Sequence, residues 1–106
     1  DGAAALAEAL RSNTSLTTLS LFGNKAIGDE GVKALAEALK VNTTLKELVL
    51  EFCGIGDDGA AALAESLRSN TSLTTLNLGH GQGISEQVQQ LLRDAVAGRH
   101  RFALLV

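Results

Sequence analysis

The sequence contains no proline, tryptophan, tyrosine or methionine, and it has one cysteine and three phenylalanines. Without proline, no position has to interrupt a helix or strand through a missing backbone donor. Cys53 has no partner for an internal disulfide, and a lone thiol favours a reducing, cytoplasmic setting. Because 45% of the residues are apolar and so few are aromatic, we expect an aliphatic core.

Charge and hydropathy argue against two classes of partner. The formal net charge is -3, so the chain lacks the basic balance typical of nucleic-acid binding. No apolar run approaches the roughly 20 residues of a membrane-spanning helix. We therefore expect no nucleic-acid partner and no membrane partner. At 106 residues, the chain has the length of one domain.

What the sequence does contain is repetition. LRSNTSLTTLSL at residues 10–21 returns as LRSNTSLTTLNL at residues 67–78. Related strand-like segments begin at Leu16, Leu45 and Leu73, so the repeating unit is 29 and then 28 residues long. Periods of about 20–50 residues are typical of solenoids, in which one unit buries its apolar face only against its neighbours.

Each unit predicts a short strand followed by a helix. The leucines of the L-x-x-L-x-L segment alternate with a period of two, as in a strand with one buried face. The runs VKALAEAL and AAALAESL place leucines four residues apart on one helix face. The acids before these runs suit the positive end of a helix: Asp29, Glu30, Asp57, Asp58 and Glu86. Alternating strands and helices predict an α/β, right-handed β-α solenoid with its parallel sheet concave and its helices convex.

The helix ends carry recurring residues as well. Ser85, Gly28 and Gly56 occupy the predicted N-cap position. Asparagine recurs just after each helix, where we expect a left-handed residue that ends it: Asn13, Asn42 and Asn70. The same three residues begin Asn-x-Ser/Thr motifs that could accept N-glycans. Because all three motifs lie at the same position of the repeat, where a turn favours Asn followed by small polar residues, a structural role is the favoured interpretation.

The pattern L-x-x-L-x-L-x-x-N/C resembles the leucine-rich repeat, and it ends at Asn24 in one unit and at Cys53 in the next. The 28/29 alternation and the I-G-D-x-G steps at Ile27 and Ile55 resemble the ribonuclease-inhibitor-like subfamily. That subfamily forms the C-terminal repeats of NOD-like receptors. It also occurs in Ran GTPase-activating protein and in actin-capping proteins of the tropomodulin type. The resemblance implies a cytoplasmic protein–protein interaction module within a larger sensing or regulatory protein.

The two ends of the chain differ from the middle. Residues 1–106 are predicted to form a single leucine-rich-repeat domain of about 3.5 repeats, with 84–106 as a C-terminal cap-like repeat. There, Gln89 and Arg93 replace the small residues of earlier helices, while Phe102 and Leu105 are assigned to the first and second leucine positions of a fourth strand. The N-terminal side is predicted to be truncated or to self-associate, because Ala3 and Ala7 leave the outer face of the first helix apolar, without long polar residues such as Gln89 and Arg93.

Recognition is expected on the outward strand positions, which vary while the leucines repeat. Phe22 beside Glu51 would offer an apolar anchor next to an acid, which fits a basic or amphipathic protein partner. A solvated sheet face with one exposed aromatic residue is the competing interpretation. The predicted partner-binding residues are Thr18, Ser20, Phe22, Glu47, Val49, Glu51, Thr75 and Asn77, with Gly79, Leu104 and Val106 continuing the same face.

No residue pattern predicts catalysis, a cofactor or a metal site. Cys53 fills the Asn/Cys position of the repeat, where a buried structural thiol is favoured over a nucleophile. His80 and His100 lie in different units and are expected in exposed loops. The segment from Gly79 to Gly83 lacks the lysine of a phosphate-binding loop, and Gly81 in the Asn/Cys position predicts a looser turn. The alternative function is a self-assembling or consensus-like scaffold without a specific ligand.

Overall fold

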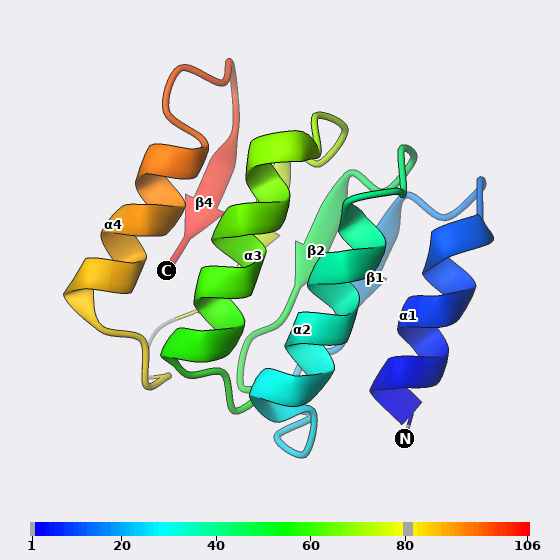
Figure 1. Ribbon diagram of the computed structural model, residues 1–106, viewed down its shortest axis with the longest axis horizontal. Coiled ribbons are helices and arrows are strands. Elements are labelled where there is room, and N and C mark those ends of the chain that lie inside the picture. Colours follow the sequence, from blue (N-terminus) through cyan, green and yellow to red (C-terminus); the bar gives the residue numbers. More distant parts are fainter. Residues whose placement is uncertain (1, 80–81) are drawn as a thin grey trace.

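The computed structural model describes residues 2–79 and 82–106, and in these ranges four helices alternate with four strands. Figure 1 shows the helices side by side in one layer and the strands behind them in a second layer. The bounds are α1 Gly2–Ser12, β1 Thr18–Ser20, α2 Gly28–Leu39, β2 Glu47–Val49, α3 Asp57–Ser69, β3 Thr75–Asn77, α4 Glu86–Ala95 and β4 Ala103–Leu105.

The sheet is parallel, and its spatial order β1-β2-β3-β4 follows the order of the chain. Leu48 pairs with Leu19 on one side and with Leu76 on the other, so leucines form one row across the sheet. Leu48 and Leu76 are fully buried, and Leu19 on the edge strand is half-buried. The predicted α/β solenoid, with a concave parallel sheet and helices on the outside, is confirmed.

The core is aliphatic, as the composition predicts. Strand leucines and helix leucines meet between the two layers, and Leu35, Leu50 and Leu63 are fully buried. Each such leucine stabilises the fold by about 1.5–3 kcal/mol relative to an exposed one. Small residues such as Ala36 and Ala60 are also buried, which lets neighbouring helices approach closely.

A ladder of asparagine side chains joins successive units at the ends of the helices. Asn42 Nδ2 donates to the carbonyl oxygen of Leu10 at 2.9 Å, and Asn70 Nδ2 donates to that of Leu39 at 2.7 Å. Both side chains are only 4% exposed. Asn70 Oδ1 also accepts from the backbone N–H of Leu73 at 2.9 Å. Each asparagine therefore closes its own turn and satisfies carbonyl groups of the unit before it.

The prediction that these asparagines are left-handed is wrong. Among the described residues, the positive-φ residues other than glycine are Phe52 and Arg101, and Asn70 has φ -80° and ψ 126°. The asparagine turn is closed by the side chain, so the backbone does not have to reverse there. The structural interpretation of the glycosylation motifs holds at Asn42 and Asn70, because both amide nitrogens are buried in the ladder.

Carboxylates at the helix starts also link the units. Asp29 Oδ1 accepts from the backbone N–H of Gly56 at 2.6 Å, and Asp57 Oδ1 accepts from that of Ser85 at 2.7 Å. Ser85 is the predicted N-cap, since its hydroxyl accepts from the N–H of Val88 at 3.3 Å, and Gly56 holds the N-cap position of α3. The prediction for Gly28 is wrong, because Gly28 is the first residue of α2 itself.

The C-terminal strand is shifted by one residue from the prediction. Leu104, and not Leu105, pairs with Leu76, so Leu104 and Val106 pack against the core while Leu105 is 46% exposed. The prediction that Leu104 and Val106 lie on the outward face is therefore wrong.

The cause of the shift is Arg99, which takes the ladder position after α4. Its guanidinium donates to the carbonyl oxygens of Leu67 at 3.2 Å and Leu73 at 2.7 Å, and its Cζ lies 4.8 Å from the centre of the Phe102 ring. Arginine has no side-chain acceptor, so it cannot accept from the backbone N–H groups of its own turn as asparagine Oδ1 does. Arg101 has a φ of 62°, and β4 begins four residues after Arg99, whereas β3 begins five residues after Asn70.

Candidate protein-binding face

The eight predicted partner-binding residues lie together on the sheet face that is turned away from the helices. The strand register aligns Thr18 with Glu47 and Thr75 in one row. A second row aligns Ser20 with Val49 and Asn77. The β1 residues of these rows are exposed, and the β2 and β3 residues are half-buried. Because the leucines between them point into the core, these side chains form the outer surface of the sheet. We call this surface, continued by Phe22 and Glu51, the sheet face.

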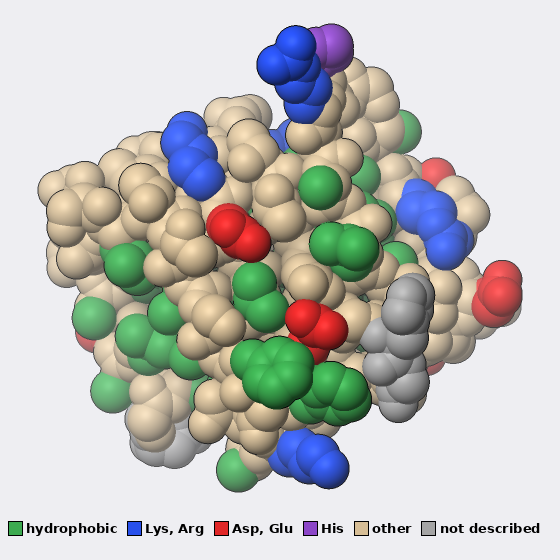
Figure 2. Space-filling view, turned by 180° about the vertical axis from the view of Figure 1, so that it is seen from behind, with side chains coloured by type: hydrophobic (Ala, Val, Ile, Leu, Met, Phe, Trp, Pro, Cys, Tyr) green, Lys and Arg blue, Asp and Glu red, His purple; other side chains and the backbone are tan. Residues whose placement is uncertain are grey.

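An aromatic pair stands at one end of the sheet face. Phe22 is 58% exposed and Phe52 is 49% exposed, and their ring centres lie 5.4 Å apart in an edge-to-face arrangement. Figure 2 shows large hydrophobic side chains beside acidic ones on the side of the molecule opposite the helices. Exposed aromatic residues of this kind are frequent anchors in protein interfaces.

Phe52 is absent from the predicted site. It follows Glu51, so strict alternation would turn its side chain away from the sheet face. Its φ of 58° lies in the left-handed region, and the residue at the same position one unit earlier is Gly23, with φ 80°. The signal that could have found it is a phenylalanine where the preceding repeat has glycine.

Glu51 is fixed by its neighbours on the next strand. Its Oε1 accepts from Asn77 Nδ2 at 3.0 Å, and Asn77 Oδ1 accepts from the backbone N–H of Gly79 at 2.9 Å. A Cβ at position 79 would lie 2.8 Å from Glu51 Cγ, so the glutamate side chain crosses directly over Gly79. The glycine therefore makes room for an ordered carboxylate.

The sheet face is acidic. Glu47 and Glu51 are its charged members, and none of the eight residues is basic. Among residues 2–79 and 82–106, the ion pairs are Lys33–Glu30 at 3.4 Å within α2 and Lys40–Glu37 at 2.9 Å at its C-terminal end. The two sheet-face carboxylates therefore have no cationic partner within the described chain.

Cys53 lies beneath this surface as a buried structural residue. Its Sγ donates to the carbonyl oxygen of Leu21 at 3.1 Å, and the side chain is fully buried. Burial raises the pKa of the Cys53 thiol, opposed in part by a hydrogen bond with the backbone of Asn24. A thiol kept protonated in this way is a poor nucleophile.

In the third unit, Gln82, one residue after the Asn/Cys position, makes side-chain contacts with the backbone of the preceding unit. Gln82 Nε2 donates to the carbonyl oxygen of Leu50, and its Oε1 accepts from the N–H groups of Cys53 at 3.2 Å and Ile55 at 2.9 Å. The looser turn predicted at Gly81 and the exposure predicted for His80 concern residues outside the described ranges. His100 is exposed, as predicted.

Two other kinds of site have no counterpart in the described ranges. No group of three or more His, Cys, Asp or Glu side chains there is arranged to hold a metal ion. No helix in the same ranges combines the length and apolar character needed to cross a membrane.

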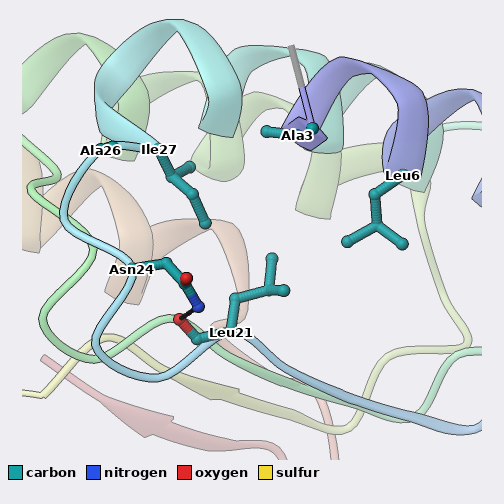
Figure 3. Close-up of a pocket in the computed structure, with 7 residues that line it drawn as sticks. Ala3, Leu6, Leu21, Asn24, Ala26 and Ile27 are labelled. Carbon is teal, nitrogen blue, oxygen red and sulfur yellow. Dashed lines mark hydrogen bonds between the residues drawn. The ribbon is translucent and has the colours of Figure 1, made fainter.

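A cavity of about 320 Å³ opens between α1 and the loop that follows β1. Figure 3 shows Ala3 and Leu6 on the helix side and Leu21 and Ile27 on the loop side. The prediction that Ala3 and Ala7 form an exposed apolar surface is wrong. Ala7 is buried, and Ala3 lies against Gly31 of α2, so these alanines face the next helix.

The stacked strand–helix units, the shared aliphatic core and the asparagine ladder define a βα solenoid repeat protein. A family model described as Leucine Rich repeat matches residues 12–36, 41–64 and 69–85, more than half of the chain. The chain therefore belongs to the leucine-rich repeat family, whose domains typically mediate protein–protein interaction. A search of curated protein sequences finds no match.

Two solved structures share the fold at low sequence identity. One is described as leiomodin-1 actin-binding site 2, with a TM-score of 0.83 and 24% identity. The other is the C-terminal domain of Caenorhabditis elegans tropomodulin, with a TM-score of 0.85 and 19% identity. The alignments cover 93% and 99% of this chain but only 57% and 63% of those chains. At these identities the two neighbours show a shared fold alone, and the ribonuclease-inhibitor-like and NOD-like receptor assignments stay predictions.

Proposed function

We propose that the chain is a protein-binding module that holds a protein partner on its concave sheet face, as part of a larger sensing or regulatory protein. The observation that carries the proposal is the exposed Phe22–Phe52 pair beside the ordered carboxylate of Glu51. A parallel sheet with fixed register keeps these side chains in place before contact, which lowers the entropy cost of association. One solved neighbour is described as an actin-binding site, which supports a protein partner for this fold.

The chemistry of the face favours a basic or amphipathic partner. Glu47 and Glu51 supply negative charge without an internal cation, and Phe22 and Phe52 supply apolar surface. Such complementarity raises the rate of encounter and selects the orientation of the partner. We infer a binding role without catalysis, since the thiol of Cys53 is buried and protonated. Its unpaired state also supports a cytoplasmic location.

The test is the selection of binders from displayed libraries of peptides and small domains, followed by variants on opposite faces. Ser20→Arg and Thr75→Arg each place bulk and one positive charge on the sheet face, and Glu65→Lys makes a larger charge change of the same sign on the exposed side of α3. We expect the first two variants to weaken the selected binders at least about tenfold and the third to leave them unchanged. Binders that respond to Glu65→Lys alone would place recognition on the helices and contradict the proposal.

The second candidate is a self-associating scaffold, favoured by the apolar cavity at the N-terminal end. If that end is an interface, light scattering will show a mass that rises with concentration, and Leu6→Lys will abolish the rise. Leu6 is half-buried and lines the cavity, so it replaces Ala7 as the position to test. Concentration-independent monomers would remove this candidate and leave the binding module.

A further inference from the structure

We propose that Phe22, Phe52 and Glu51 form a binding site for an arginine side chain of the partner, an inference that rests on the proposed function. The guanidinium would stack on the aromatic pair and donate to the carboxylate of Glu51. This arginine site specifies one contact of the sheet face: a planar cation, flanked by apolar residues of the partner segment.

Backbone hydrogen bonds bring Phe22 and Glu51 together. The ladder between β1 and β2 continues past both strands, since the N–H of Leu21 donates to the carbonyl of Val49 and that of Gly23 donates to Glu51, each at 2.9 Å. Phe22 and Glu51 therefore occupy neighbouring positions at the strand spacing of about 4.8 Å. An aromatic ring and a carboxylate are thus held side by side on one surface.

Phe52 completes the site through an unfavourable backbone conformation. A left-handed phenylalanine costs about 1–2 kcal/mol relative to an extended one, and glycine occupies this position one unit earlier. The ring is not used for core packing, because it remains 49% exposed and its aromatic contact is with Phe22, itself exposed. Strain that serves an exposed side chain is typical of functional positions.

The carboxylate of Glu51 is ordered but only partly used. Asn77 holds Oε1 at 3.0 Å, and Gly79 leaves space for the side chain. The second oxygen has no hydrogen-bond donor among residues 2–79 and 82–106, and no lysine or arginine there pairs with it. An ordered acceptor beside two aromatic rings matches a group that is cationic, planar and a hydrogen-bond donor.

The chain itself contains an example of the same chemistry. Arg99 lies over the ring of Phe102 while its guanidinium donates to two carbonyl oxygens. Guanidinium stacks on aromatic faces and keeps its in-plane donors free, whereas an ammonium group is more strongly hydrated. Arginine is therefore favoured over lysine as the ligand of Phe22, Phe52 and Glu51.

The test titrates two peptide probes that differ in one side chain, acetyl-Gly-Ser-Leu-Arg-Leu-Ser-Gly-amide and its citrulline counterpart. Citrulline keeps the planar shape and loses the charge. Binding is followed through the NMR shifts of the ring protons of Phe22 and Phe52. Phe102 is the internal reference, because its ring is already covered by Arg99. We expect the arginine peptide to bind at least about fivefold more tightly, with shifts confined to the first two rings.

Three variants separate the contributions. Glu51→Gln keeps an acceptor for Asn77 and should remove most of the preference for arginine over citrulline. Phe52→Gly places glycine where the preceding repeat already has it, and should weaken the arginine peptide about tenfold without loss of fold. Glu65→Gln, an equal charge change on α3, should leave both affinities unchanged.

Equal binding of the two peptides would overturn the arginine site and indicate an apolar anchor alone. Full affinity in Phe52→Gly, or an equal loss in Glu65→Gln, would overturn it as well. Failure here is distinct from failure of the proposed function. If Ser20→Arg and Thr75→Arg abolish selected binders while arginine shows no preference, the binding face stands and the arginine site falls.

Discussion

Residues 10–21 and 67–78 have nearly the same sequence, and they behave differently in the fold. Asn70 in the second copy is 4% exposed and donates to two carbonyl groups of the preceding unit. Asn13 in the first copy is exposed, and its Oδ1 accepts from its own turn, at 2.7 Å from the N–H of Leu16. Leu76 is fully buried, whereas Leu19 is half-buried.

The difference teaches that the sequence of a unit does not fix its contribution to stability. In the second copy, two neighbours bury the leucines and supply carbonyl groups for the ladder. In the first copy, β1 is an edge strand with one neighbouring strand, and Leu21 lines the cavity between α1 and the loop after β1. Stability in a solenoid is approximately a sum of unit terms and interface terms, and only the interface terms differ between the copies.

Truncating the second strand leucine in both copies should give the largest contrast. Leu76→Ala is expected to cost about 3–4 kcal/mol of unfolding free energy, because it opens a cavity in a fully buried site. Leu19→Ala is expected to cost about 1–2 kcal/mol, since its site is partly open to solvent. Denaturant unfolding of the two variants measures both values. Equal costs would mean that the edge unit is packed as tightly as the interior.

The ladder asparagines should give the next largest contrast. Asn70→Ala leaves the carbonyls of Leu39 and Asn42 without their side-chain donor and the N–H of Leu73 without an acceptor. We expect a loss of about 2–3 kcal/mol. Asn13→Ala removes only the turn contacts and should cost about 0.5–1 kcal/mol.

Chemical denaturation under identical conditions checks the asparagine pair. Asn70→Asp is the informative companion, because it keeps the acceptor for the turn and loses the donor to the preceding unit. If Asn13→Ala and Asn70→Ala prove equally damaging, the turn and not the ladder is what the asparagine contributes.

The smallest expected effect concerns the position after the strands, which is Gly23 in one unit and Phe52 in the next. Phe52→Gly should raise stability by about 0.5–1 kcal/mol, because relief of the left-handed phenylalanine (about 1–2 kcal/mol) outweighs the larger backbone entropy that glycine loses on folding. Gly23→Ala should lower it by a similar amount. Thermal unfolding of both variants compares them. Destabilisation by Phe52→Gly would show that the ring supports the fold, which removes the argument that its strain serves binding.

Most of the fold could be predicted from the repeat. The leucine spacing predicted strands, helices, a parallel sheet and an aliphatic core, because period-2 and i, i+4 patterns follow from backbone geometry. The outward placement of Thr18 through Asn77 follows from the same alternation. The left-handed state of the asparagines was predicted wrongly, because a side-chain turn and a backbone turn favour the same residue type.

Other features could not be read from one unit at a time. Phe52 joins the sheet face through a positive φ that alternation does not predict, and Arg99 moves β4 by one residue by replacing the asparagine turn. Both depend on contacts between units: the first on the ring of Phe22, the second on the carbonyls of Leu67 and Leu73. These contacts join residues about 30 positions apart in the sequence.

The sequence by itself determined the repeating unit, its strand and helix, and the side of each that is buried, because these follow from short-range periodicity and backbone sterics. The tertiary structure alone decided which copies of a residue are buried, where the last strand pairs, and that two phenylalanines and a glutamate meet on one face. Those outcomes depend on which unit lies next to which, and burial and hydrogen bonding are properties of that contact and not of the residue.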